Sequence, residues 1–159
     1  MRRAVDFLLL LVYQLQDQVG RTRSFAFIDH LEEISGAFDE HRPEAAIPEV
    51  LRRLPAGHYN TDYGFSLEQF THDHPDAVYR RTTLIICGDG RNNYNDPRPE
   101  LLEGLVRRAR KTVWFDPEPR NLWGTGDSQM PIYGPLVDAL FQVSNLRELG
   151  EAIDRLFIG

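Results

Sequence analysis

The chain has 159 residues, of which 42% are hydrophobic and 26% charged, a composition typical of a folded globular protein with a substantial core. Its net charge of −6 argues against a nucleic-acid partner, which is normally bound by a basic face. The single cysteine excludes an internal disulfide and a cysteine-based zinc site, and we expect a cytoplasmic location.

The first predicted element is a helix over about residues 1–18. It contains an apolar run, Phe7 to Tyr13, that is too short to span a membrane. Asp6 precedes this run, and no small-residue cleavage site follows it, so a secretion signal is disfavoured. We expect a helix packed against a sheet and no membrane span.

The pattern of apolar residues predicts the elements that follow. In chain order they are strands over 23–29 and about 31–34, helices over 45–54 and 63–71, a strand over 81–87, a helix over 98–110, a strand over 112–115, a helix over 135–140, a strand over 141–143 and a helix over 146–157. Strands that alternate with helices predict an α/β fold with a doubly wound, mostly parallel sheet. With no repeat and no linker, we expect a single domain over 1–159.

Two of the predicted strands run into acids, Asp89 between two glycines and Asp116. The loops that follow parallel strands gather at one edge of the sheet, where ligands bind, and Asp29, Thr61 and Asp62 are expected nearby. Hydroxyl and carboxylate oxygens are the ligands that Mg²⁺ prefers. The same residue types also suit turns and helix caps, and their spacing does not choose between these roles.

Other candidate sites are weaker. Cys87 is either a nucleophile or, more simply, a small buried apolar residue. His72 and His74 could clip a metal ion, but their polar surroundings favour exposed loop histidines. No Gly-x-Gly-x-x-Gly or Walker-type motif occurs, so nucleotide binding is unsupported. The long irregular segment 114–128, with two tryptophans, indicates a binding surface more than a core.

Three stretches carry a resemblance to a known family: N-T-D-Y-G at 60–64, L-I-I-C-G-D-G-R-N-N-Y-N-D-P at 84–97, and W-F-D-P-E-P-R-N-L-W-G-T-G-D-S at 114–128. They resemble the CoxE-like branch of von Willebrand factor A (VWA) domains, and the resemblance covers most of the chain. It implies a Rossmann-like, doubly wound fold with a metal-ion-dependent adhesion site (MIDAS). In that site Thr61 would be the threonine and Asp89 the aspartate that faces Mg²⁺ through a water.

The sequence departs from the family at its start. No D-x-S-x-S loop, which supplies the other site residues, occurs anywhere in the chain. In the family a methionine and a helix commonly follow that loop, and here Met1 leads directly into the first helix. We expect the domain to be incomplete at its N-terminus, lacking the first, central strand, so that its neighbours have unpaired backbone groups. The chain alone would then be poorly stable, or would fill the slot with another strand or chain.

The resemblance implies a binding module and not an enzyme. Relatives of this branch are accessory factors that partner a MoxR-type AAA+ ATPase in the maturation of a client metalloenzyme. Magnesium would keep an open position for a partner's carboxylate. The expected rim of this docking site comprises Asp62, Tyr63, Asn92, Asp116 and Trp123. Two alternatives stay open: a small Mg²⁺-dependent hydrolase with Asp89 and Asp116 as ligands of an activated water, and a degenerate scaffold that binds no metal.

Overall fold

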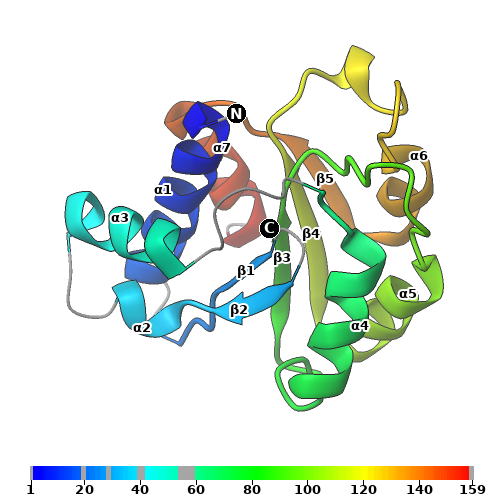
Figure 1. Ribbon diagram of the computed structural model, residues 1–159, viewed down its shortest axis with the longest axis horizontal. Coiled ribbons are helices and arrows are strands. Elements are labelled where there is room, and N and C mark those ends of the chain that lie inside the picture. The colour runs from blue at the N-terminus through cyan, green and yellow to red at the C-terminus, as the bar shows by residue number, and fades with distance from the viewer. Residues whose placement is uncertain (1, 19–20, 28–29, 39–41, 54–59, 158–159) are drawn as a thin grey trace. The chain divides into compact units, whose positions relative to one another are not determined.

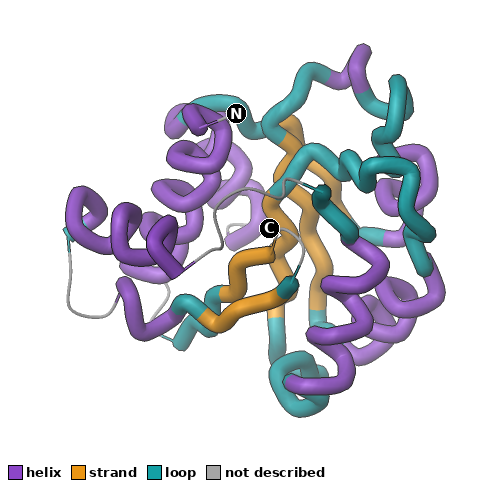
Figure 2. Tube along the Cα trace, viewed as in Figure 1, coloured by secondary structure: helices purple, strands orange, loops and turns teal. Residues whose placement is uncertain are grey.

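The structure is a computed structural model that describes residues 2–18, 21–27, 30–38, 42–53 and 60–157. The chain divides into two compact units, Met1–Asn60 and Thr61–Gly159, whose elements are drawn in Figures 1 and 2. The single domain expected over 1–159 stays a prediction, and Asp29 lies outside the described residues.

The N-terminal unit is mainly helical. Its elements are α1 (Arg2–Gln18), β1 (Phe25–Phe27), β2 (Leu31–Glu33), α2 (Ser35–Phe38) and α3 (Pro43–Arg53). The two short strands pair antiparallel, with Phe25 opposite Glu33, so they form their own ribbon and are not part of the expected parallel sheet. The core of this unit consists of Leu9, Ile34, Ala37, Phe38, Ala46 and Val50. No helix in the described part of the chain is long and apolar enough to cross a membrane.

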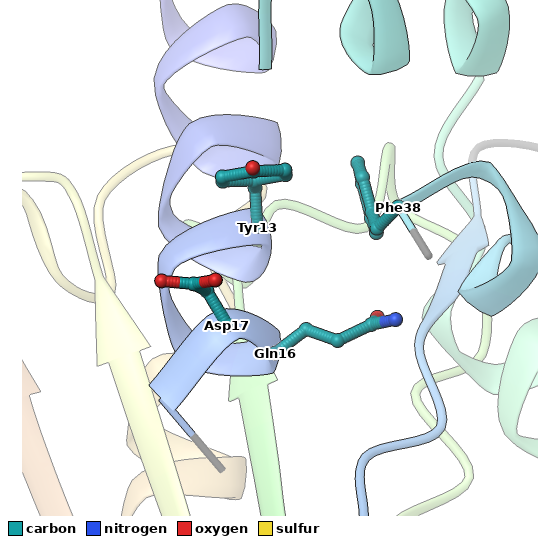
Figure 3. A pocket seen from close by; sticks show the side chains of 4 residues that line it. All are labelled: Tyr13, Gln16, Asp17 and Phe38. Atoms are coloured by element: carbon teal, nitrogen blue, oxygen red, sulfur yellow. The ribbon is translucent and has the colours of Figure 1, made fainter. Parts of the chain in front are cut away.

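A small open pocket of about 200 Å³ in this unit is lined by Tyr13, Gln16, Asp17 and Phe38 (Figure 3). The rings of Tyr13 and Phe38 meet edge to face, with centroids 5.7 Å apart. The Gln16 amide donates to the Ser35 carbonyl at 3.1 Å. Ligand pockets usually enclose roughly 300–1,000 Å³, and this open pocket is smaller, so it is a weak candidate for a ligand-binding site.

The C-terminal unit contains a parallel sheet with the strand order β3 (Thr83–Cys87), β4 (Lys111–Asp116), β5 (Ala139–Gln142). Its helices are α4 (Tyr63–Asp73), α5 (Pro99–Arg108), α6 (Met130–Tyr133) and α7 (Leu146–Phe157), with short 3₁₀ turns η1 (Arg120–Leu122) and η2 (Gly134–Leu136). In Figure 1, α4, α5 and α6 lie on one side of this sheet and α7 on the other. The predicted doubly wound α/β arrangement is confirmed.

One predicted element is misplaced. The helix expected over 135–140 is found earlier, as α6 and η2, and β5 already begins at Ala139. Asp138 explains the boundary, because its Oδ2 accepts the Thr112 backbone N–H at 2.6 Å and aligns the start of β5 with β4. This contact between distant segments is not visible in the local pattern.

The strand β3 lies at the edge of the described sheet. It pairs with β4 on one side, and no other strand of the described residues pairs with it. All five of its residues are partly exposed, whereas Thr112 to Asp116 in β4 are buried. A strand that is apolar on both faces is typical of a sheet interior.

The core of the C-terminal unit includes a stack of three aromatic side chains. Trp114 on β4 stacks on Tyr63 and on Tyr133, with ring centroids 5.6 and 5.3 Å away, and the two tyrosine rings are themselves 5.8 Å apart, so all three rings contact one another. The Trp114 indole N–H donates to the Gly88 carbonyl at 2.7 Å, and the Tyr133 hydroxyl donates to the Pro97 carbonyl at 2.6 Å. The stack therefore fixes two helices and the loop after β3 to the central strand.

We expect Trp114→Ala to lower the free energy of unfolding by about 3–5 kcal/mol, because it opens a cavity in the stack and removes the bond to Gly88. Urea denaturation followed by circular dichroism measures this change. Tyr79→Ala is the control, since that ring is 56% exposed and its loss should cost less than about 0.5 kcal/mol. Equal losses in the two variants would contradict the central role of the stack.

Candidate functional site

Parallel pairing brings the loop after β3 and the loop after β4 to one end of the sheet, as Figure 1 shows. An isolated antiparallel bridge between Arg91 and Ser128 joins the two loops. Backbone bonds reinforce it, from Asn92 N–H to the Asp127 carbonyl at 3.2 Å and from Gln129 N–H to the Gly90 carbonyl at 2.8 Å. The expected gathering of these two loops at one edge is thus present.

Asp89 and Asp116 occupy similar positions in the two strand–loop junctions. Asp89 comes just after the end of β3, and Asp116 is the last residue of β4. In each, Oδ1 accepts the backbone N–H two residues ahead: Arg91 at 3.0 Å for Asp89 and Glu118 at 2.7 Å for Asp116. Both acids therefore act as turn residues. They differ in burial, because Asp89 is partly exposed and Asp116 is 0% exposed. Within the described residues, the buried Oδ2 of Asp116 has no hydrogen-bond partner.

Burial makes this pair of carboxyl groups hard to ionise. Loss of water raises the pKa of Asp116 to about 7, and the charges of Asp89 and Glu118 add to the rise. Two groups act in the opposite direction and lower the pKa of Asp116: the Glu118 backbone N–H and the nearby Trp123 indole. The indole N–H itself donates to the Glu118 carbonyl at 3.0 Å. The pKa of Asp89 is also raised, first by burial and then by Glu118 and Asp127.

Arg91 ties the two loops together on the acidic side. Its guanidinium donates two parallel bonds to Glu118, at 2.9 and 2.8 Å, and a third to Asp127 at 3.1 Å. It also donates to the Thr125 carbonyl at 3.0 Å. Such fork-shaped contacts are strong and geometrically specific. We call this arrangement the Arg91 clamp.

Asn92 organises the loop from inside. It is completely buried, its Oδ1 accepts the Tyr63 backbone N–H at 2.6 Å, and its amide donates to the Asn95 carbonyl at 2.8 Å. The Asn95 N–H closes a tight turn on the Asn92 carbonyl at 2.9 Å. The two residues inside that turn, Asn93 and Tyr94, have φ values of 50° and 60°. A left-handed conformation is costly for a tyrosine, and this ring is 80% exposed.

The start of α4 lies against the same loop. Asp62 is the N-cap of this helix, with its side chain accepting the Phe65 N–H at 2.8 Å, and the preceding Thr61 accepts the Asn95 amide on its carbonyl at 3.3 Å. The Tyr63 hydroxyl accepts the Gly90 N–H at 3.3 Å. A Cβ on Gly88 would lie 2.1 Å from that hydroxyl, so only glycine fits beside it.

The expected docking rim is largely internal. Asn92 and Asp116 are 0% exposed and Tyr63 is 5% exposed, so these three side chains hold the loops and do not face a partner in this conformation. Asp62 and Trp123 are partly exposed and can form a surface. The Arg120 guanidinium lies over the Trp123 ring, 5.2 Å from its centroid.

Sequence reasoning missed four residues that shape this edge: Arg91, Tyr94, Glu118 and Asp127. The three that form the clamp are spread over two loops, and only the folded chain brings them together. The asparagine-rich loop did predict a turn, but nothing in it assigned a left-handed backbone to Tyr94.

The weaker candidates are not assembled into sites. Burial raises the pKa of the Cys87 thiol to about 12, the opposite of what a nucleophile needs. His72 is exposed and contacts Asp73 at 2.7 Å. Over the described ranges, no group of three or more His, Cys, Asp or Glu side chains is placed to hold a metal ion.

A parallel sheet flanked by helices, with acids at two adjacent strand ends, defines a Rossmann-like domain, a class in which ligands bind at this edge of the sheet. A family model described as "VWA domain containing CoxE-like protein" matches residues 1–149, and the chain belongs to this family. No curated protein and no solved structure matches the chain. Family membership indicates a protein-interaction module.

We expect Arg91→Met to loosen the Arg91 clamp while β4 stays intact. The Asn93 N–H, which donates to Asp127 Oδ2 at 2.9 Å, should then exchange with solvent about ten- to a hundredfold faster. Hydrogen exchange read residue by residue tests this. The matched control is Arg147→Met, which breaks an exposed pair with Glu151 on α7 and should leave both loops unchanged. Unaltered exchange at Asn93 would show that the clamp does not order the loop.

We expect the buried carboxyl of Asp116 to make the protein less stable as the pH rises from about 4 to 7. The folded state holds the proton up to a pKa of about 7, whereas the unfolded carboxyl ionises near 3.8, so each rise in pH favours unfolding over this window. Asp116→Asn removes the effect and should gain up to about 4 kcal/mol relative to wild type by pH 7.

Urea denaturation of both proteins in chelator, at pH values from 4 to 8, measures that difference. The amide introduced by Asp116→Asn retains an Oδ1 that can accept the Glu118 N–H, so the turn is preserved. A difference that does not change with pH would contradict the assignment. Asp89→Asn, run in parallel, separates the contribution of the neighbouring acid, whose pKa is also raised.

Proposed function

We propose that this chain is a protein-binding module that docks a partner's carboxylate through a divalent cation, Mg²⁺, held at the edge formed by the loops after β3 and β4. The observation that carries the proposal is Asp89, a partly buried acid at the edge where the two loops are joined, whose pKa is raised by burial. Anionic oxygens without a cation or proton are costly to bury, and a cation would satisfy them.

The donor chemistry fits Mg²⁺. This ion is usually held by one or two carboxylates and retains several waters, so it does not need a dedicated cage of protein ligands. Asp89 and the Thr61 hydroxyl are the residues that the family's MIDAS would use. Because the sequence lacks the D-x-S-x-S loop, the donor set is partial, and we expect modest affinity.

The docking surface would be rigid before the partner arrives. The Arg91 clamp and the buried Asn92 fix both loops, which reduces the entropy lost on binding. We place the rim at the exposed or partly exposed side chains Asp62, Tyr94 and Trp123. Rigid aromatic side chains of this kind frequently carry most of the energy of an interface.

We propose that the partner is a MoxR-type AAA+ ATPase in the cytoplasm, and that the complex serves maturation of a client metalloenzyme. Membership of the CoxE-like VWA family supports this choice. Binding without catalysis is part of the proposal. The one cysteine supports it, because a buried thiol with a pKa of about 12 is not an activated nucleophile.

The test is binding of the chain to a purified MoxR-type ATPase, measured by biolayer interferometry with about 5 mM Mg²⁺ or with EDTA. We expect Mg²⁺-dependent binding that Asp89→Ala weakens by about tenfold or more. Trp123→Ala and Tyr94→Ala should weaken it further, while Tyr79→Ala, which removes an exposed tyrosine far from these loops in sequence, should not.

Binding that ignores EDTA and Asp89→Ala would overturn the metal-dependent mechanism and favour the metal-free scaffold. Mg²⁺-dependent turnover of a phosphoester by the chain would overturn the assignment as a binding module. An absence of binding to the ATPase under both conditions would overturn the choice of partner.

A further inference from the structure

We propose that Asp116 is itself a cation ligand, so that Asp89 and Asp116 form a two-carboxylate site for a hard divalent cation across two neighbouring strands. This inference rests on the proposed function and deepens it, because it adds a ligand from β4 and so gives the edge a carboxylate pair that does not depend on the D-x-S-x-S loop. Four observations on the C-terminal unit lead to it.

The first observation is the state of the Asp116 side chain. It is 0% exposed, one oxygen accepts a single N–H, and the other has no hydrogen-bond partner in the described structure. An ionised carboxylate in such a place costs several kcal/mol unless an opposite charge compensates it. A structural acid is normally satisfied on both oxygens, so the free oxygen points to a ligand.

The second observation is the strand register. Cys87 lies opposite Phe115, and the Gly88 N–H donates to the Phe115 carbonyl at 3.0 Å, so the backbones of Asp89 and Asp116 leave adjacent strands one residue out of step. With strands about 4.8 Å apart and about 3.3 Å per residue, their Cα atoms are separated by roughly 6 Å. That separation, together with the effect of the Asp89 charge on Asp116, places the two carboxyl groups within electrostatic reach of each other.

The third observation is electrostatic. The charge of Asp89 makes Asp116 harder to ionise, and both acids raise the pKa of the buried Tyr63 hydroxyl, so the three groups share one environment. Tyr63 and Trp114 stack directly beneath this edge. The site therefore has aromatic rings close enough to report on a bound lanthanide ion.

The fourth observation is the lack of a protein cation at Asp116. The nearest guanidinium, that of Arg91, is engaged by Glu118 and Asp127, and no ion pair to Asp89 or Asp116 forms among the described side chains. The Arg91 clamp also holds the loop that follows Asp116. Its ion pairs are partly exposed, and a cation would enter when they open.

The donor types indicate which cation would bind. The two acids and a nearby threonine offer oxygen only, and no histidine or thiol ligand joins them in the described residues. Zinc prefers nitrogen and sulfur, whereas Mg²⁺ and Mn²⁺ accept few carboxylates and complete their shell with water. The site is therefore assigned to a hard divalent cation.

The experiment is a titration with Tb³⁺, an oxygen-seeking ion, with luminescence excited through the protein's tyrosines and tryptophans, followed by displacement with Mg²⁺. Wild type is compared with Asp116→Asn, Asp89→Asn and Arg91→Met. Asp154→Asn, the same charge change on an exposed residue of α7, is the matched control. We expect Asp116→Asn and Asp89→Asn each to weaken both ions by about tenfold or more, and Asp154→Asn to change neither by more than about twofold.

Arg91→Met separates ligation from loop order. If Asp116 is a ligand, removing the guanidinium eases entry and lessens repulsion, so affinity should stay equal or rise. A loss as large as that of Asp116→Asn would instead show that both act by ordering the loop, and would overturn the inference. Circular dichroism and thermal melts of each variant confirm that binding is compared between folded proteins.

The remaining outcomes separate the inference from the proposed function. If Asp89→Asn weakens binding and Asp116→Asn does not, the inference fails and the proposed function stands. If Asp116→Asn weakens binding and Asp89→Asn does not, Asp116 is a ligand and the role given to Asp89 fails. If Mg²⁺ displaces no Tb³⁺ from the wild-type protein, both the inference and the proposed function are overturned.

Discussion

The parallel pairing of β3 with β4 is the interaction on which the whole edge depends. It sets Asp89 and Asp116 one residue out of step on neighbouring strands and delivers both following loops to the same place. The stack of Tyr63, Trp114 and Tyr133 then fixes α4 and α6 to that pairing. The site is thus assembled from the central strand outward, and the loops inherit their positions from the sheet.

The same pairing explains what local sequence reasoning could predict. Apolar runs and acids at strand ends predicted β3, β4 and the shared edge, because parallel topology alone places those acids together. The start of β5 was misplaced, since it depends on the Asp138 side chain bonding to Thr112 across the sheet. The antiparallel ribbon of β1 and β2 was also missed as a separate element, because short strands do not reveal their pairing direction in their sequence.

Within the site, it was easier to predict from the sequence which residues take part than what each residue does. Asn92 and Asp116 stood out in the sequence, but an exposed rim and a buried support use the same polar residues. Asn92 is internal because its amide satisfies both the first turn of α4 and its own loop. The Arg91 clamp joins residues 27 and 36 positions apart, so no local motif contains it. Burial and long-range hydrogen bonds decided these roles.

The buried carboxyl of Asp116 links these features into one physical argument. Its charge can be relieved by a proton or by a cation, and by no side chain that the structure describes there. In the cation-bound form that we propose, Mg²⁺ would compete with a proton for this carboxyl, whose pKa is raised to about 7. A partner's carboxylate that completes the cation's shell would favour the metal-bound form. On this proposal, docking of the partner and compensation of the buried charge would be coupled, so a site with few protein ligands would respond to the partner.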